Sequence, residues 1–171
     1  MLNGKDLYSK WKIESEKMVQ EESNNYVILR PSLIVGLSPN TTNDMPFNRI
    51  LKNIAENTPA KYDTSWKFEI TYLKHLSEVI QKIIEDDSIK NTIISVASKG
   101  ATNRYKLAVD ILSNFGIVVG KEDKGVNQPL DEIDYSVMKK LELPEYTYEE
   151  AIKNIVFETK EYLNNFNNNH I

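Results

Sequence analysis

The chain has 171 residues, of which 40% are hydrophobic and 27% charged, with a formal net charge of -4 at pH 7 and a pI near 5.3. This length and apolar content suit one domain with a sizeable core and make a second full domain unexpected. An acidic chain is not attracted to a phosphate backbone, so we expect no nucleic-acid partner. Cysteine is absent, which excludes disulfides, thiolate nucleophiles and cysteine metal sites.

The two histidines and the apolar runs argue against metal sites and membranes. His75 has no carboxylate cluster beside it, so we expect it to be packed or solvated, and no metal site is predicted. The longest apolar stretches, around residues 27–37 and 93–97, are far shorter than the roughly 18 residues that a membrane span needs. The N-terminus lacks the basic leader and apolar core of a secretory signal. The sequence therefore predicts a cytoplasmic chain with no membrane partner.

In chain order, the first elements are a helix, a strand and a second helix. The helix is expected over residues 6–22, with an apolar stripe that should face a core. This stripe consists of Leu7, Trp11 and Met18. The apolar, β-branched run 27–30 predicts a buried strand, and a loop rich in turn-forming residues then leads to a helix over 47–56.

The middle of the chain continues this alternation. A short strand over 68–71 precedes a helix over 73–85, in which apolar residues recur at the spacing of one helical face. These are Leu76, Val79, Ile80, Ile83 and Ile84. Residues 92–97 predict the second buried strand. A helix capped by Thr102 should follow and end before Gly116, which favours a left-handed cap.

The C-terminal third contains shorter signals. A strand is expected over 117–119, a short helix over 134–141, and a final helix opened by Thr147 with early acidic residues. The Asn-rich end, residues 161–171, has the composition of a disordered polar tail. Because strands and helices alternate throughout, the fold class is α/β.

Tyr8 and Lys12 stand four residues apart on the first helix and therefore share one face. An ammonium near a phenol favours the ionised phenol, and a phenol tuned in this way can pass a proton to a developing alkoxide. A second pair with this spacing, Tyr135 and Lys139, is what chance supplies in a chain with nine tyrosines. Only the first pair is followed by the rest of a helix, a short turn and an apolar run ending in residues 30–32. This order singles out Tyr8 and Lys12.

That ordered stretch resembles the second half of the extended short-chain dehydrogenase/reductase superfamily. It is most similar to the dTDP-4-dehydrorhamnose reductases and to sugar-nucleotide-binding relatives of the NAD-dependent epimerase/dehydratase type. Further segments continue the resemblance in the same order, so that it extends from Leu7 to about Val156. They are residues 44–50, 68–73, 92–98 and 127–131.

The resemblance implies the C-terminal part of a Rossmann-like, doubly wound parallel sheet with a small substrate-binding subdomain, in a single partial domain over residues 1–160. It implies reduction of a 4-keto sugar nucleotide with NAD or NADP. Tyr8 would be the proton donor, and Lys12 would hold the cofactor ribose. Pro31 and Ser32 match a segment whose backbone approaches the nicotinamide, although the two residues could equally just end a strand.

The resemblance also implies a nucleotide-sugar ligand. Asn48 and Gln128 fall where relatives contact the sugar nucleotide. Gln128 replaces a commonly found arginine, and the loss of a planar cation weakens bidentate pairing with a diphosphate. Trp11 and Trp66 are interpreted as packing residues rather than as platforms for substrate.

Two departures from the family pattern suggest half an enzyme. The glycine-rich turn that cradles the cofactor pyrophosphate does not occur, and the family's catalytic Ser or Thr precedes its tyrosine, whereas Tyr8 is the eighth residue here. We therefore expect a chain that is inactive alone and is completed by a separate N-terminal half or a homo-oligomer through an exposed sheet edge. Two alternatives stay open: a non-catalytic sugar-nucleotide-binding or regulatory subunit, and the remnant of a split gene.

Overall fold

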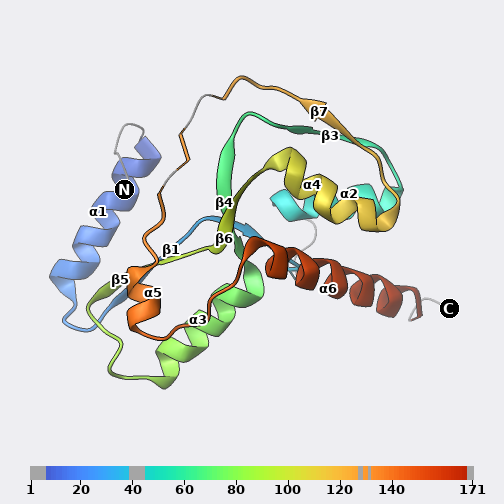
Figure 1. Cartoon of the computed structure of the whole chain (residues 1–171). Coiled ribbons are helices and arrows are strands. Elements are labelled where there is room, and N and C mark those ends of the chain that lie inside the picture. Colours follow the sequence, from blue (N-terminus) through green and yellow to red (C-terminus); the bar gives the residue numbers. More distant parts are fainter. Residues whose placement is uncertain (1–6, 39–44, 127–128, 131, 169–171) are drawn as a thin grey trace.

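The structure is a computed structural model that describes residues 7–38, 45–126, 129–130 and 132–168. Its helices follow the predicted order (Figure 1). They are α1 (Leu7–Glu22), α2 (Pro46–Glu56), α3 (Leu73–Glu85), α4 (Arg104–Leu112), the 3-10 turn η1 (Ser113–Phe115), α5 (Ser136–Lys140) and α6 (Tyr148–Asn168). None of the helices in these ranges is both long enough and apolar enough to cross a bilayer.

The strands form three small sheets in which parallel pairing dominates. β1 (Val27–Pro31) pairs in parallel with β5 (Thr92–Val96), so both predicted strands are confirmed. β4 (Lys67–Tyr72) is the centre of the second sheet, parallel to β2 (Leu33–Val35) and antiparallel to β6 (Ser98–Asn103). β3 (Ala60–Asp63) pairs in parallel with β7 (Val119–Glu122). The predicted α/β class is confirmed.

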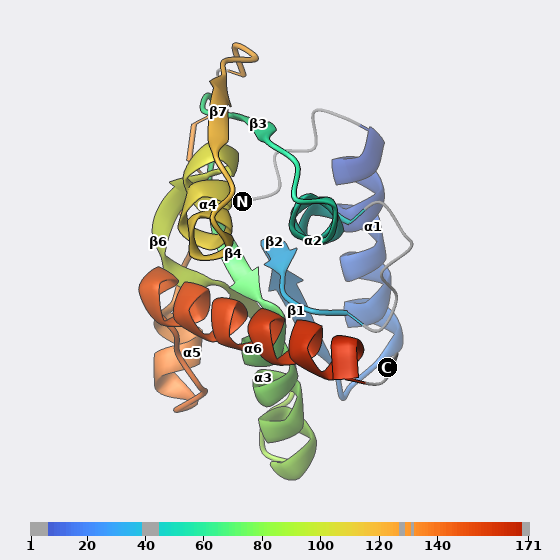
Figure 2. The same cartoon turned by 90° about the vertical axis from the view of Figure 1, so that its right-hand side faces the viewer.

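Two apolar clusters form the core. The larger one joins the sheet around β4 to α2, α4 and α6, and α6 lies across one face of that sheet (Figure 2). The smaller one joins β5 to α3 and α5 through residues that include Val79, Ile94 and Met138. Burial of these side chains, worth about 1.5–3 kcal/mol each, is what holds the helices against the sheets.

Ser32 links the β1–β5 sheet to the sheet around β4 at the point where β1 ends. Its amide donates to the Thr71 hydroxyl at 2.8 Å, and its own hydroxyl donates to the Glu69 carbonyl oxygen at 2.6 Å. The Thr71 hydroxyl in turn donates to the Val96 carbonyl oxygen at 2.6 Å. Because buried polar groups must be paired, these bonds fix the chain between β1 and β2 against β4 and β5.

The predicted orientation of the first helix is wrong. Leu7, Trp11 and Met18 are 70%, 66% and 57% exposed, and α1 buries no side chain. Trp11 is accordingly not a packing residue. The half-buried positions are Ser9, Ile13 and Glu16, at spacings of four and three, so a more polar face of the helix lies against the protein. In Figure 1, α1 lies at the outer margin beside β1 and β5.

Several boundaries also differ from the predictions. Thr102 lies in β6, which was not predicted, and the cap of α4 is Asn103, whose side-chain oxygen accepts from the Lys106 amide at 2.7 Å. Strands β2 and β3 were not predicted either, because each has only three or four residues. Ile80 and Ile84 are exposed members of the α3 stripe.

The last helix starts as predicted and runs further than expected. The Thr147 hydroxyl accepts from the Glu150 amide at 3.2 Å, while the Glu150 carboxylate accepts from the Thr147 amide at 2.8 Å. This reciprocal capping box begins α6. The helix continues to Asn168, into the segment predicted to be a disordered tail, and Ile155 and Thr159 are buried near its middle.

Candidate functional site

The predicted catalytic pair lies on the outward side of α1. Tyr8 is 70% exposed. The Lys12 Nζ atom lies 5.6 Å from the centroid of the Tyr8 ring, so the ammonium sits over the ring face. The four-residue spacing therefore does bring the two side chains together, at a surface that a ligand can reach from solvent.

The other predicted site residues lie in different environments. Pro31 is exposed at the end of β1, whereas the amide and hydroxyl of Ser32 are engaged in the bonds that join the sheets. Asn48 is 7% exposed on the inner face of α2. Gln128 lies outside the described residues. The described chain thus brings Tyr8 and Lys12 together, and it places Asn48 on a separate element.

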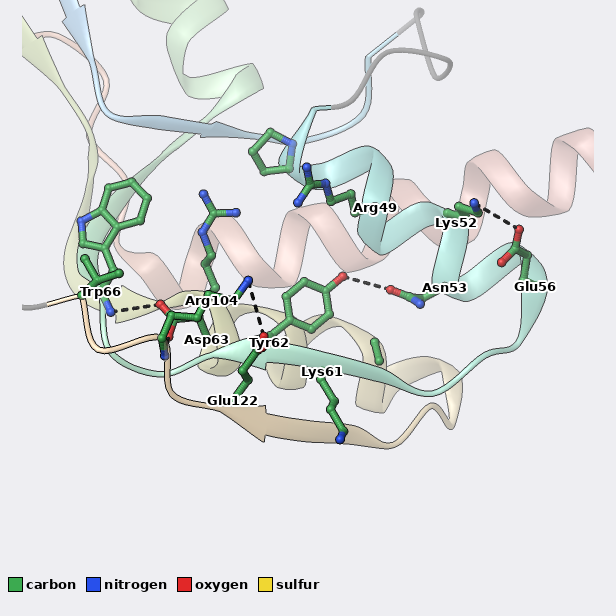
Figure 3. A pocket seen from close by; sticks show the side chains of 14 residues that line it. Arg49, Lys52, Asn53, Glu56, Lys61, Tyr62, Asp63, Trp66, Arg104 and Glu122 are labelled. Carbon is green, nitrogen blue, oxygen red and sulfur yellow. Dashed lines mark hydrogen bonds and ion pairs between the residues drawn. The ribbon is translucent and has the colours of Figure 1, made fainter.

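A pocket of about 690 Å³ opens between α2, β3 and α4, with the segment after β7 along its rim (Figure 3). Its lining contains five basic side chains. These are Arg49, Lys52, Lys61, Arg104 and Lys124. The described lining residues do not include the predicted site residues, and in Figure 1 α1 and the pocket helices lie on opposite sides of β4.

Arg104 and Trp66 form the most specific feature of the pocket. The Arg104 guanidinium carbon lies 5.3 Å from the Trp66 ring centroid, and Trp66 packs on Phe68 with ring centroids 5.1 Å apart. Arg49, from α2, points toward Arg104 across the pocket (Figure 3). A guanidinium stacked on an indole keeps the N–H donors at its edge available for an anion.

The acidic residues of the pocket are largely engaged already. Glu56 pairs with Lys52 at 3.8 Å, and Glu122 pairs with Lys124 at 3.5 Å. Tyr62 donates to the Asn53 side-chain oxygen at 2.9 Å, and burial raises the pKa of its phenol, so it acts as a neutral group. With its carboxylates committed, the pocket offers a net positive surface beside aromatic rings.

Asp63 organises the mouth of the pocket rather than acting as a base. Its carboxylate accepts from the Ser65 hydroxyl at 2.7 Å and from the amides of Ser65, Trp66 and Lys124 at 3.1, 3.3 and 3.0 Å. These bonds, with the Ser65 hydroxyl first, hold the pKa of Asp63 well below its usual range. One carboxylate thereby fixes the turn that carries Trp66 and the segment that follows β7.

Sequence reasoning missed this pocket. Trp66 and Arg104 are far apart in the chain and lie on a turn and at the start of a helix, so no short-range spacing connects them. The antiparallel pairing of β4 with β6, in which Lys67 lies in register with Asn103, brings these residues together at the start of α4. The sequence does offer one signal for the pocket, which is that Trp66 stands among turn-forming residues. From the sequence, Trp66 is nevertheless interpreted as a packing residue.

Residues 2–166 match the protein family described as the RmlD substrate binding domain. The chain belongs to this family. The resemblance inferred from the sequence is thereby confirmed, since the match covers almost the whole chain. The search of curated proteins found no match.

Solved structures share the fold at low identity. The dTDP-4-dehydrorhamnose reductase from Bacillus anthracis, in complex with NADP, has a TM-score of 0.74 and 18% identity over 90% of this chain and 56% of that one. The reductase from Clostridium acetobutylicum has a TM-score of 0.71 and 17% identity over 90% and 55%. A UDP-N-acetylglucosamine 4-epimerase from Methanobrevibacter ruminantium, in complex with UDP-N-acetylmuramic acid, has a TM-score of 0.71 and 17% identity over 92% and 54%.

These matches confirm the predicted partial Rossmann-like fold. The chain spans little more than half the length of the reductases and epimerases that it matches. Its family is related to nucleotide-sugar oxidoreductases, and the neighbours include structures with nicotinamide cofactors.

Proposed function

We propose that this chain is the nucleotide-sugar-binding part of an oxidoreductase that reduces a 4-keto sugar nucleotide with NAD or NADP. The observation that carries this proposal is the pocket between α2, β3 and α4, where cationic side chains lie beside aromatic rings. A nucleotide sugar combines a planar base with a diphosphate, which are the two groups that such a lining can bind. The UDP-glucose and UDP-N-acetylmuramic acid named for two epimerase neighbours support this ligand class, and the NADP named for a reductase neighbour supports the cofactor.

The diphosphate pairs with the guanidinium groups of Arg104 and Arg49, which point across the same space. Trp66 orients Arg104 by its cation–π contact, and the Tyr62 ring offers a face on which a base can stack. Asn48 and Gln128 remain proposed contacts of the sugar nucleotide. Gln128 follows closely on Val126, which lines the pocket.

The chemical step is assigned to the α1 side. An exposed phenol with an ammonium over its ring fits the nicotinamide–ribose end of a cofactor. A bound nicotinamide cofactor supplies the hydride. Tyr8 gives a proton to the carbonyl oxygen as it becomes an alkoxide, and Lys12 holds the ribose. Pro31 and Ser32 provide the backbone of the strand end beside the nicotinamide.

A second polypeptide completes the cofactor site in this proposal. Among the described residues, β1 pairs only with β5, which leaves its other edge for a further parallel strand, and the exposed stripe of α1 lies nearby. Open strand edges invite pairing with another chain. A separate N-terminal half is the preferred occupant, and a second copy is the alternative. Light scattering that shows a monodisperse monomer, with slow amide exchange at Ile28 and Leu29, would contradict both.

Calorimetric titration with dTDP-glucose tests the binding proposal. The chain should bind it, and Arg104→Gln should weaken binding about tenfold or more, because a charge-assisted hydrogen bond is worth about 1.5–3 kcal/mol. Lys140→Gln, on α5, removes one positive charge away from the pocket and should bind as the unmodified chain does. Equal affinities for Arg104→Gln and Lys140→Gln would rule out the pocket as the diphosphate site.

One observation favours a non-catalytic binding subunit as the second candidate. The described pocket is built from residues 46–126 and needs neither Tyr8 nor Lys12. Binding can therefore persist without chemistry. Retained dTDP-glucose binding in a Tyr8→Phe variant, with no turnover in the presence of any N-terminal partner, would favour this candidate over the oxidoreductase.

A further inference from the structure

The attachment of α1 to the rest of the chain is unusually polar. The helix buries no side chain, and the three positions that are half-buried against the protein are Ser9, Ile13 and Glu16. One apolar side chain contributes little to holding a 16-residue helix in place. The position of Tyr8 and Lys12 therefore depends on the polar contacts of this face.

The strongest of these contacts is a two-pronged ion pair between Glu16 and Arg30. The Arg30 Nε and Nη2 atoms donate to the two Glu16 carboxylate oxygens at 2.9 and 2.5 Å. The Glu16 side chain is 16% exposed and that of Arg30 is 39% exposed, so the pair is partly shielded from water. Parallel guanidinium–carboxylate bonds restrict orientation as well as distance.

Arg30 provides a rigid point of attachment. It lies in β1 in register with Ser95 of β5, and the chain two residues later is fixed by the bonds of Ser32 to β4. Arg30 therefore connects α1 to the part of the structure where the β1–β5 sheet meets the sheet around β4.

Glu16 occupies the helical position that best transmits this constraint. Tyr8, Lys12 and Glu16 follow one another at intervals of four residues, and each interval rotates a side chain by about 40° around the helix axis. Fixing the direction of Glu16 consequently fixes the directions of Lys12 and Tyr8. A helix held only through Ile13 could turn about its own axis and move both groups away from the strand end.

We infer that Glu16 and Arg30 are a positioning pair that fixes the rotation of α1, and with it the placement of Tyr8 and Lys12 relative to the end of β1. That this placement matters for catalysis rests on the proposed function. That Glu16 and Arg30 fix the orientation of α1 does not depend on the proposed function.

Residual dipolar couplings of backbone amides test this inference, because they report the orientation of α1 relative to the sheets. In Glu16→Gln and in Arg30→Lys, the couplings of α1 should shrink while those of α3 and α6 stay unchanged. The Cα chemical shifts of α1 should remain helical. The melting temperature should hardly move, because α1 buries no side chain.

Two further variants make the test decisive. Glu14→Gln is the matched control, since Glu14 is on the same helix and makes only an exposed pair with Lys17 at 3.8 Å; its couplings should equal those of the unmodified chain. The exchanged pair Glu16→Arg with Arg30→Glu should restore the α1 couplings. Unchanged couplings in Glu16→Gln, an equal loss in Glu14→Gln, or no restoration in the exchanged pair would each overturn the inference.

The same samples separate this inference from the proposed function. Titration with dTDP-glucose should give the same affinity in all these variants, because the pocket lies on other elements. An unmodified chain that fails to bind dTDP-glucose would remove the proposed function, whereas the dipolar couplings would still decide whether Glu16 and Arg30 position the helix.

Discussion

The two Tyr-x-x-x-Lys pairs of this chain share a spacing, and a lysine ammonium lies over each tyrosine ring, Lys12 over Tyr8 and Lys99 over Tyr135. They differ in the burial of the tyrosine and in the carboxylate that Tyr135 contacts. Tyr8 is exposed on α1 with the Lys12 ammonium over its ring. Tyr135 donates from its hydroxyl to the Glu69 carboxylate at 2.5 Å, and Glu69 also accepts from the Gly100 amide at 3.1 Å. Burial, together with the Glu69 carboxylate, raises the pKa of Tyr135 well above its ordinary value.

The difference shows that a spacing describes a possible contact and that the surrounding fold decides the chemistry. Three other tyrosines follow the pattern of Tyr135. Tyr72, Tyr146 and Tyr148 donate to Glu158, Glu78 and Asp110, respectively. Burial, followed by the carboxylate, raises the pKa of each of these phenols and keeps it protonated, and each bond joins segments that are distant in the chain. Tyr8, by contrast, is exposed. It lies on α1, the helix that the sequence singles out, with the Lys12 ammonium over its ring.

The largest expected effect is on turnover. The 171-residue chain alone should not reduce a keto-sugar nucleotide. Once a cofactor-binding N-terminal half is supplied, Tyr8→Phe should lower the rate about 10²–10⁴-fold, the usual contribution of a positioned acid, whereas Tyr135→Phe should retain it. Rates measured side by side check this. Turnover by the chain alone, or a normal rate in Tyr8→Phe, would contradict it.

The free energy of unfolding should rank the two variants in the opposite order, with Tyr135→Phe showing the larger effect. Tyr135→Phe leaves the Glu69 carboxylate without one of its donors and should lower the free energy of unfolding by about 1–3 kcal/mol. Tyr8→Phe changes an exposed group and should stay within about 0.5 kcal/mol. Urea unfolding of both variants is the measurement. If Tyr8→Phe destabilises the chain as much as Tyr135→Phe does, the contrast between the two environments is wrong.

A smaller effect on the free energy of unfolding is expected from His75, which is buried as Tyr72 and Tyr148 are. Its Nε2–H donates to the Pro144 carbonyl oxygen at 2.7 Å, its Nδ1 is buried with no partner among the described residues, and burial lowers its pKa. The folded state therefore favours the neutral ring. Its contribution to stability is complete above the unfolded pKa of about 6.5 and is lost as the pH falls through that value toward the lower folded one.

The free energy of unfolding, measured between about pH 7.5 and 5.5, can isolate the contribution of His75, because this range brackets the unfolded pKa of about 6.5. His75→Gln should remove a slope of at most about 1.4 kcal/mol per pH unit. His170→Gln, at the other histidine of the chain, should keep the slope. The same slope in the two variants would show that His75 is not the titrating group.

Much of the fold followed from local signals. The helices α1, α2 and α3 and the strands β1 and β5 were predictable because apolar periodicity and β-branched runs are properties of neighbouring residues. β3 and β6 were not, since the first has four residues and the second carries little apolar character. The inward face of α1 also escaped prediction, because its main contact is an ion pair between Glu16 and Arg30, which lie on different elements.

The candidate site likewise has one part that local signals predict and one part that they do not. The contact between Tyr8 and Lys12 was predictable from their spacing on one helical face, whereas their catalytic role stays a prediction. The pocket was not predictable, because Trp66 and Arg104 meet through the pairing of β4 with β6, two strands that are far apart in the chain. Pairing between distant segments depends on the assembled sheet, which no local pattern encodes.

The central claim is that the pocket between α2, β3 and α4 binds the nucleotide sugar, and amide and indole NMR signals test it most directly. Addition of dTDP-glucose should shift the Trp66 indole signal and the amides of β3, with little change at Lys153 on α6. Shifts confined to the groove between α4 and α6, near Lys106 and Lys153, or no shifts at all, would contradict it.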